Sequence, residues 1–371
     1  MDSAVAALRL RDAGWDVQGL FMHNWEDDDS FCSAADDYQD ARAACAQLGV
    51  PLHRVNFARQ YRDEVFDLFL AEHRAGRTPN PDVLCNRRIK FGVCREYARR
   101  LGAEWFATGH YARLGHADEG ATLLKASNAA KDQSYFLHAV TREQLQNVLF
   151  PIGEMSKAQV RAVARQAALA VHDKPDSTGI CFIGERPFRE FLRQFIVDTP
   201  GPILSQDGVT MGEHRGLPFY TLGQRAGLAI GGRAGASAAP WYVAAKDAQR
   251  NALIAVQGEQ HPLLFSVALT TEAMHWLCEP RSADFQATAR LRHRHSDQKV
   301  RVEPQSDGTA VLHFEQPQRA ATPGQYAVIY DGERCLGGAA IARTYAASDI
   351  ISGEFPLRRD HGRDFSRPEV S

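Results

Sequence analysis

In the first half of the chain, the pattern of hydrophobic and polar residues switches between one typical of strands and one typical of helices. Short apolar runs, typical of buried strands, occupy residues 17–22, 52–57 and 104–108. Apolar residues three and four positions apart predict four helices. They lie over residues 2–13, in a segment that ends at Gly49, and over residues 61–74 and 83–101. Ser3 is placed to cap the first helix and Gly14 to end it. Strands and helices that alternate at this spacing favour a doubly wound parallel α/β sheet.

The second half of the chain has a different pattern. Two further helices are predicted over residues 157–169 and 187–197, before a boundary at the Pro-Gly-Pro of residues 200–202. Glycines and short strands then predict a small mixed module, and period-two alternation over residues 261–345 predicts an antiparallel β-barrel. We therefore predict an α/β domain at 1–199, a small mixed central domain at 200–258, a barrel domain at 259–346 and a disordered polar tail at 347–371.

Composition narrows the class of protein. The chain has 371 residues and a formal net charge of −2, so any nucleic-acid site must be a local patch. No run reaches the roughly 18 apolar residues of a membrane span, and no signal-peptide pattern opens the chain. Seven scattered cysteines do not resemble a secreted disulfide framework. We expect a cytoplasmic protein whose thiols are available for chemistry.

One stretch, Thr78-Pro-Asn-Pro-Asp-Val-Leu-Cys-Asn-Arg-Arg88, combines a rigid turn with a cysteine. Its two prolines delay the helix until Asp82, which can serve as the N-cap. Cys85 would then lie in the first helical turn, where the helix dipole and two following arginines favour a thiolate by lowering its pKa. The alternative is a buried structural cysteine, as we interpret Cys94, and the residues alone leave both readings open.

Two weaker signals lie further along the chain. The loop of residues 172–184 contains Ser177-Thr-Gly-Ile-Cys-Phe182, in which Gly179 permits close backbone approach beside Cys181. The same residues are also compatible with a buried strand. A predicted strand over residues 287–295 places Arg290, Arg292 and Arg294 on one face. Such a row favours a phosphate contact, with a merely solvated basic face as the alternative.

At this point the chain resembles a known family, the tRNA-specific 2-thiouridylases. The resemblance extends from Asp2 to about Tyr345 and depends on several separated motifs, none of which is specific alone. These motifs are Thr78-Pro-Asn-Pro-Asp-Val-Leu-Cys-Asn86, Ala107-Thr-Gly-His-Tyr-Ala112, Lys131-Asp-Gln-Ser-Tyr-Phe136, Ser177-Thr-Gly-Ile-Cys-Phe182, Tyr220-Thr-Leu-Gly-Gln-Arg225 and Thr322-Pro-Gly-Gln325.

The resemblance implies a fold and a reaction. The first domain would be a PP-loop ATP pyrophosphatase of the adenine nucleotide alpha hydrolase type, which adenylates O2 of the wobble uridine with ATP and Mg²⁺. Cys181 would carry the persulfide sulfur that replaces this oxygen, and AMP would leave. Cys85 would be the catalytic nucleophile that resolves the persulfide by forming a disulfide with Cys181. Asp82 would complete the catalytic group.

The resemblance also implies binding residues and partners. ATP would contact Met22 and Gly109, with Asp2 and Ser3 at its pyrophosphate. The tRNA would contact Asn80, Pro81, Asp82, His110, Lys131, Asp132, Gln133, Arg292, His293 and Gln325. A cysteine desulfurase or a sulfur relay protein would supply the sulfur, and the chain would act as a monomer without a membrane partner.

The chain departs from the family pattern at its beginning. The family's phosphate loop reads Ser-Gly-Gly-x-Asp-Ser after a first strand, whereas this sequence begins Met1-Asp2-Ser3. Glycines at that loop let backbone N–H groups surround a pyrophosphate. A start site placed too far downstream accounts for the difference without loss of function. A true truncation would instead predict weak ATP binding.

Two alternatives to the thiolation hypothesis, and one variant of its mechanism, remain. One is a tRNA-binding homologue that has lost catalysis with its phosphate loop, which two retained cysteines argue against. Another is an amide-forming ATP pyrophosphatase, which needs neither the cysteines nor a basic strand. The third keeps the reaction but has Asp82, Cys85 and Cys181 ligate an iron–sulfur cluster in place of the persulfide relay. Charge-transfer absorption in the spectrum of anaerobically purified protein would distinguish this last hypothesis from the persulfide hypothesis.

Overall fold

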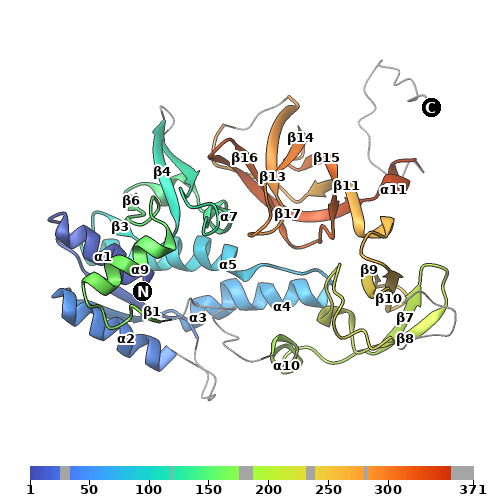
Figure 1. The fold of residues 1–371 in the computed structure, drawn as a ribbon, viewed down its shortest axis with the longest axis horizontal. Coiled ribbons are helices and arrows are strands. Elements are labelled where there is room, and N and C mark those ends of the chain that lie inside the picture. The colour runs from blue at the N-terminus through green and yellow to red at the C-terminus, as the bar shows by residue number, and fades with distance from the viewer. Residues whose placement is uncertain (26–33, 118–119, 175–186, 231–238, 280–282, 352–371) are drawn as a thin grey trace.

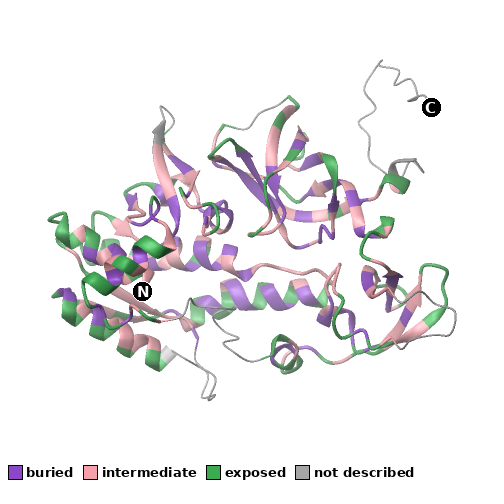
Figure 2. Cartoon of the chain, in the orientation of Figure 1, coloured by how far each residue is buried: buried purple, intermediate pink, exposed green. Residues whose placement is uncertain are grey.

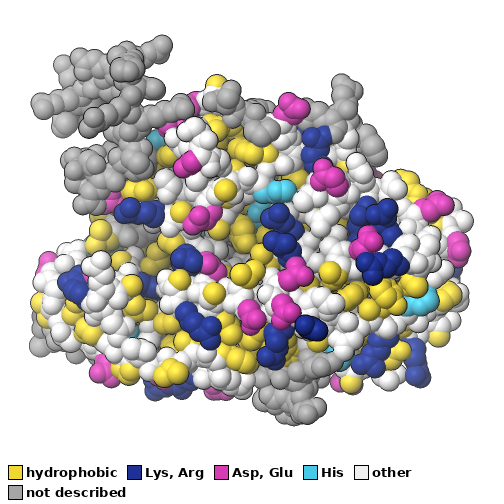
Figure 3. Space-filling model, turned by 180° about the vertical axis from the view of Figure 1, so that it is seen from behind, with side chains coloured by type: hydrophobic (Ala, Val, Ile, Leu, Met, Phe, Trp, Pro, Cys, Tyr) yellow, Lys and Arg dark blue, Asp and Glu magenta, His cyan; other side chains and the backbone are white. Residues whose placement is uncertain are grey.

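The computed structural model describes residues 1–25, 34–117, 120–174, 187–230, 239–279 and 283–351 (Figure 1). Among these residues, no helix combines the length and the apolar character needed to cross a membrane. Acidic and basic side chains are interspersed on the face seen from behind, with no single large patch of one sign (Figure 3). Positive charge available to an RNA on that face is therefore local.

The first part of the chain forms the predicted α/β layers. Strand β1 (Gly19–His23) pairs in parallel with β2 (Leu52–Asn56), and β3 (Phe106–Ala107) pairs in parallel with β6 (Val148–Leu149), as two separate two-stranded sheets. The helices α1 (Asp2–Asp12), α2 (Ala34–Leu48) and α9 (Lys157–Gln166) pack beside them (Figure 1). Gly14, with φ +85°, follows α1 as predicted, but Ser3 does not cap it, because the N-cap is Met1 and no side chain caps the helix.

Two long helical segments cross the middle of the molecule. The first consists of α3 (Ala58–Tyr61), η1 (Arg62–Phe66) and α4 (Asp67–Arg74). The second consists of α5 (Pro81–Leu84), the π-helical η2 (Cys85–Cys94) and α6 (Arg95–Arg100). The predicted N-cap of this second segment was wrong by two residues: Asn80 caps the helix and Pro81 is its first residue. Proline suits that position because its missing N–H would be unpaired there anyway.

A hairpin connects the α/β part to the barrel. Strands β4 (Ala112–Ala117) and β5 (Gly120–Lys125) pair antiparallel, and β5 continues into the barrel sheet through Leu124 opposite Arg334. The short helices α7 (Ser134–Leu137), α8 (Arg142–Leu145) and α10 (Phe188–Arg193) follow along the chain. The hairpin, α7 and the barrel share one hydrophobic core, which includes Leu123 and Tyr330.

The central part is a four-stranded sheet in the order β8-β7-β10-β9. Its strands are β7 (Gly201–Ser205), β8 (Thr210–His214), β9 (Trp241–Asp247) and β10 (Ala252–Gln257), and the turn η3 (Leu217–Phe219) lies between β8 and β9. Ile203 and Val243 of this sheet belong to the same core cluster as Phe66 and Ile89 of the crossing helices. The central sheet is therefore packed directly against the α/β part.

The last part is the predicted antiparallel barrel. After the turn η4 (Pro262–Leu264), its strands are β11 (Phe265–Thr271), β13 (Phe285–Arg290), β14 (Gln298–Pro304), β15 (Ala310–Arg319), β16 (Tyr326–Asp331) and β17 (Arg334–Tyr345). Pairing of β11 with both β15 and β17 closes it, and the short β12 (His275–Trp276) adds to β17. Buried residues run through these strands and along the crossing helices (Figure 2).

Two predictions about this last part were wrong. The strand expected over residues 287–295 ends at Arg290, so the three arginines do not share a strand face. The tail expected from residue 347 begins with a short helix, α11 (Ala347–Ile351), whose first turn is closed by the carboxylate of Asp349 accepting from the N–H of Ala346 at 2.7 Å. Residues 352–371 lie outside the described part of the chain.

Candidate functional site

The site begins where the chain enters the second crossing helix. The side chain of Asn80 accepts a hydrogen bond from the N–H of Asp82 at 3.2 Å and so starts the helix. Burial raises the pKa of Asp82, an effect opposed by the positive charge of Lys90 and by nearby His293. A carboxyl group held in this way keeps its proton to higher pH than an ordinary aspartate does. Asp82 stays a predicted catalytic residue.

Cys85 lies deeper in the structure than the sequence predicted. It follows α5 as the fifth helical residue, and its N–H already bonds inside the helix, so the prediction of a first-turn position was wrong. The macrodipole falls off within the first turn, which weakens that argument for a thiolate. The residue is 2% exposed and belongs to the core cluster around Tyr61 and Phe66. Cys181, its expected partner, lies outside the described residues, as does any disulfide or cluster that would include it.

The barrel touches the segment that precedes this helix. The amide of Gln325 donates to the carbonyl oxygen of Thr78 at 2.7 Å and to that of Pro79 at 3.4 Å. The N–H of Thr78 in turn donates to the carbonyl oxygen of Pro323 at 2.9 Å. The motifs at 78–86 and 322–325, more than 200 residues apart in sequence, therefore meet in one place. Gln325 stays a predicted tRNA contact.

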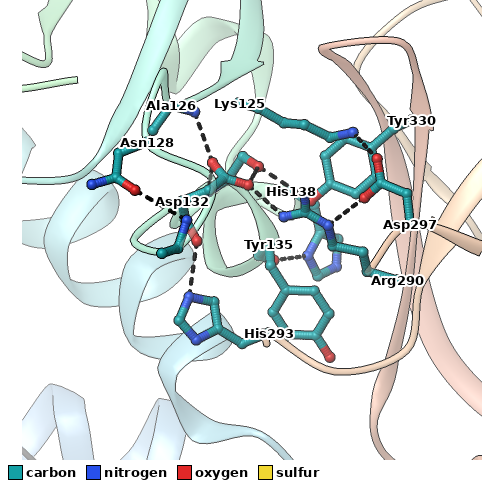
Figure 4. A network of polar contacts seen from close by, with 12 residues as sticks. Lys125, Ala126, Asn128, Asp132, Tyr135, His138, Arg290, His293, Asp297 and Tyr330 are labelled. Carbon is teal, nitrogen blue, oxygen red and sulfur yellow. Dashed lines mark hydrogen bonds and ion pairs between the residues drawn. The ribbon is translucent and has the colours of Figure 1, made fainter. Parts of the chain in front are cut away.

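Asp132 lies at the centre of a second meeting point between the first part of the chain and the barrel (Figure 4). Its buried carboxylate accepts from the N–H of Ala126 at 2.8 Å, from the N–H and hydroxyl of Ser134 at 3.2 and 2.8 Å, and from Arg290 at 2.5 Å. Arg290 also pairs with Asp297, which Lys125 contacts as well. The predicted phosphate contact by Arg290 is therefore wrong: its guanidinium is used inside the protein.

The other predicted RNA contacts surround this carboxylate. The imidazole of His293 bonds through Nε2 to the carbonyl oxygen of Asp132 at 2.8 Å, and its ring centre lies 4.4 Å from that of Phe136. Gln133 pairs with Tyr111 in both directions, donating its N–H at 2.7 Å and accepting from the N–H of Tyr111 at 2.9 Å. This pairing brings the loop beside His110. The partly exposed Lys131 lies on the same loop.

His110 is buried among aromatic rings. Its Nδ1 lies 2.8 Å from the hydroxyl of Thr108, and its ring packs against Phe91 and Phe150. Burial, together with the charge of Lys90, lowers the pKa of His110 well below its ordinary value. The imidazole is therefore neutral at pH 7 and can act as a hydrogen-bonding group without adding charge.

A different environment holds the residues predicted to contact ATP. Gly109 lies directly against the start of α1: a Cβ on Gly109 would be 2.6 Å from the N of Ser3 and 2.8 Å from the C of Asp2. Only glycine permits this approach. The structure thus brings Asp2, Ser3 and Gly109 together, whereas Met22 lies in β1 and packs against the core that contains Trp25.

Lys157 is a candidate site residue that the sequence analysis missed. Its ammonium group contacts both carboxylate oxygens of Asp2, at 2.8 and 2.9 Å, and the hydroxyl of Tyr111 donates to the same carboxylate at 3.1 Å. Lys157 begins a helix whose capping box is formed by Ser156 and Gln159, which fixes its position. The capping box was readable from the sequence, but its proximity to Asp2, 155 residues away, was not.

The three arginines expected on one strand face have three different environments. Arg290 is buried in the ion pairs described above, and Arg294 is exposed. Arg292 lies half-buried between them and donates to the carbonyl oxygen of Ala320 at 2.6 Å. Burial and the nearby Arg319 lower the pKa of Arg292, because both disfavour the charged guanidinium. A guanidinium stays charged at pH 7 despite this shift, so Arg292 retains a positive charge next to His293.

Comparison with protein-family models divides the chain into three matched regions. Residues 1–185 match the tRNA methyl transferase HUP domain, residues 189–257 the tRNA methyl transferase PRC-barrel domain, and residues 266–341 the aminomethyltransferase beta-barrel domain. The class of protein is thus a HUP-type α/β domain followed by a PRC-barrel and a C-terminal β-barrel, in agreement with the predicted fold class.

Curated relatives define the family more closely. The tRNA-specific 2-thiouridylase MnmA of Dichelobacter nodosus is 55% identical over 356 residues, which is 95% of this chain and 94% of the relative. The corresponding proteins of Chromohalobacter salexigens and Halorhodospira halophila are 52% and 54% identical, each over 94% of this chain and 92% of the relative. This chain belongs to the tRNA-specific 2-thiouridylase family, whose members use ATP.

Proposed function

We propose that this protein is a tRNA uridine 2-sulfurtransferase that converts the wobble uridine of tRNA to 2-thiouridine. ATP first adenylates O2 of the uracil, which turns a poor leaving group into AMP. A persulfide sulfur on Cys181 then attacks C2 as AMP leaves. Cys85 attacks the inner sulfur of the resulting adduct, which releases 2-thiouridine and leaves a disulfide between Cys85 and Cys181. A thiol reductant restores the two cysteines for the next cycle.

One observation carries this proposal: residues from separated motifs form a connected series of contacts. Gly109 lies against Asp2 and Ser3, where ATP is expected. The neighbouring Tyr111 pairs with Gln133 on the next motif. Further contacts, from Asp132 to His293 and from Gln325 to the backbone before Asn80, extend the series to the barrel. A site that brings ATP to an RNA base requires such a series.

The residues at the start of α1 fit a bound polyphosphate. Gly109 lets its backbone lie directly against the helix N-terminus, where N–H groups favour anions. Lys157 neutralises Asp2 at the same place and supplies a cation for phosphate oxygens. We assign ATP to Asp2, Ser3, Gly109 and Met22, with Mg²⁺ as the ion that accompanies it and screens its phosphate charge.

The tRNA would lie across the junction of the α/β part and the barrel. Neutral His110 and the loop that carries Lys131 and Gln133 form one side, and His293 and Arg292 form the other. Asn80, Pro81 and Asp82 face the target base in this arrangement, and Gln325 completes it. Asp132 is bonded within the protein, through its carboxylate to Arg290 and through its carbonyl oxygen to His293, so its role in the interface is to hold the loop and His293 in place. A cysteine desulfurase or a sulfur relay protein is the proposed sulfur donor.

Substitution of Cys181 by serine tests the chemistry directly. Cys181→Ser should abolish 2-thiouridine formation, measured by mass spectrometry of digested tRNA, and leave the tRNA dissociation constant within about twofold in filter binding. Cys94→Ala is the matched control, because burial raises the pKa of Cys94 to about 12 and makes it unreactive. Thiolation that persists in Cys181→Ser contradicts the assigned role, and lost tRNA binding makes Cys181 structural.

A further inference from the structure

The segment Gly76–Pro79, here called the strap, joins α4 to the capping residue Asn80. It has no regular secondary structure, and Gly76 adopts φ +77°. Pro79 and Pro81 flank Asn80, and each proline fixes its own φ and restricts the residue before it. A displacement of the strap would therefore move residues 80–82 as well, because the restricted backbone angles between them cannot change to compensate.

The barrel holds the strap from one side. Thr78 donates its N–H to Pro323 at 2.9 Å and accepts the amide of Gln325 at 2.7 Å, so both backbone polar groups of Thr78 are bonded to the barrel. Gly324, with φ +90°, lies so close that a Cβ there would be 2.8 Å from the N of Thr78. These contacts explain the motif at residues 322–325.

The central sheet holds the strap as well. Lys246, on β9, donates from Nζ to the carbonyl oxygen of Gly76 at 2.9 Å. The hydroxyl of Thr221 lies 3.5 Å from that of Thr78. Thr221 begins the turn of residues 221–225, whose Gly223 and Gln224 bond to the backbone of Val243 on the same strand as Lys246. The sequence motif at 220–225 has no role in the proposed reaction steps, but the structure places it against the strap.

The buried ammonium group of Lys246 is energetically unfavourable. Burial lowers its pKa to about 8, and no carboxylate in the described part of the chain forms an ion pair with it. A buried cation without an acidic partner costs free energy that an apolar side chain of the same length would not. Its specific contribution is one directed hydrogen bond, to the residue at the start of the strap.

We propose that Lys246 and Thr221 are positioning residues of the thiolation reaction. They hold the strap from the central sheet while the barrel holds it through Thr78, and together these contacts place Asn80, Pro81 and Asp82 at the target base. The inference rests on the proposed function, and it gives the central sheet a part in the rate of the reaction beyond RNA binding. Neither residue touches the reacting atoms in this account.

The test compares Lys246→Met with the unchanged protein in three measurements. The single-turnover rate of thiolation at saturating tRNA and ATP should fall at least about tenfold, while the tRNA dissociation constant stays within about twofold. Hydrogen exchange at the amide of Thr78 should accelerate at least about tenfold, because its bond to Pro323 depends on the position of the strap. Lys299→Met is the control: Lys299 is an exposed barrel residue, paired with Glu315, and should change none of the three.

Thr221→Val serves as a second variant in case Lys246→Met does not fold. It removes a single weak contact, so its rate should fall about threefold with unchanged tRNA binding. The proposal is overturned if a folded Lys246→Met keeps its rate within about twofold, keeps slow exchange at Thr78, or loses rate only in proportion to tRNA affinity. If the unchanged protein makes no 2-thiouridine, the proposed function fails instead, and the exchange at Thr78 still reports on the strap.

Discussion

Two of the polar joints between the α/β part of the chain and the barrel use opposite physical means. One, here called the charged joint, consists of Lys125, Asp132, Arg290 and Asp297 around the ring of Tyr330. The other is the strap, where the barrel bonds almost entirely to backbone atoms. The first joint depends on ion pairs centred on the buried side chains of Asp132 and Arg290, and the second on neutral hydrogen bonds.

This difference separates two tasks. A buried ion pair is costly to break, because the partner that remains is left charged and unpaired, so the charged joint fixes which surfaces meet. A neutral hydrogen bond contributes only about 0.5–1.5 kcal/mol, so the strap can set the position of a catalytic segment without dominating stability. We therefore expect damage to the charged joint to appear mainly in unfolding, and damage to the strap mainly in rate.

Removal of Arg290 should have the largest effect on stability. Arg290→Met leaves the buried carboxylate of Asp132 without its cation and should lower the free energy of unfolding by about 3–5 kcal/mol in denaturant titration. Arg301→Met is the matched control on the neighbouring strand, since its pair with Asp284 is largely exposed and should contribute at most about 1 kcal/mol. Equal effects of the two substitutions would remove the distinction between the joints.

The two joints should also respond oppositely to pH. Burial raises the pKa of Asp297, but hydrogen bonds from Lys125 and Arg290 outweigh it, so the net pKa is lowered. Its contribution to stability is therefore present above the unfolded pKa of about 3.9 and lost as the pH falls through the folded value. The pKa of Asp82, beside the strap, is raised by burial, so its contribution is present below about pH 3.9 and lost as the pH rises through the folded value.

Substitution by asparagine separates these two contributions. Unfolding free energies measured between pH 3 and pH 8 should show that Asp82→Asn gains stability relative to the unchanged protein as the pH rises. Asp297→Asn should lose stability relative to the unchanged protein over the same rise. Slopes of the same sign in both variants would contradict the assigned environments.

The smallest expected effect concerns the loop between the joints. If Arg292 contacts a tRNA phosphate, Arg292→Ala should weaken tRNA binding and reduce the slope of log K against log salt by about one unit. Arg294→Ala is the control for a nearby exposed arginine that lacks the backbone contact of Arg292 with Ala320. An unchanged slope in Arg292→Ala would return Arg292 to a purely structural role.

Local patterns predicted most of the fold. Period-two alternation predicted the barrel, and strand–helix alternation predicted the parallel pairs, because both patterns report burial along a single element. The choice between Asn80 and Asp82 as N-cap was missed, since both side chains can cap a helix and Pro81 decides by occupying the first helical position.

Long-range pairing was not predictable from local pattern. Arg290 was predicted to contact phosphate because its partner Asp132 lies 158 residues away and no local pattern indicates the pair. Lys157 was overlooked for the same reason, since Asp2 lies 155 residues away. The motif at 220–225 was recognised without a role, because the strap that it faces is far off in sequence. Cys181 and its loop lie outside the described residues, so its pairing with Cys85 stays a prediction.

The stoichiometry of the reaction tests the central claim most directly. The protein would be incubated with ATP, Mg²⁺, unmodified tRNA and a persulfide source, and 2-thiouridine, AMP and ADP would be quantified in the same samples. We predict that 2-thiouridine forms at the wobble position only when ATP is present, with one AMP released for each sulfur transferred and no ADP. Formation of ADP, or tRNA binding without any 2-thiouridine, would contradict the account.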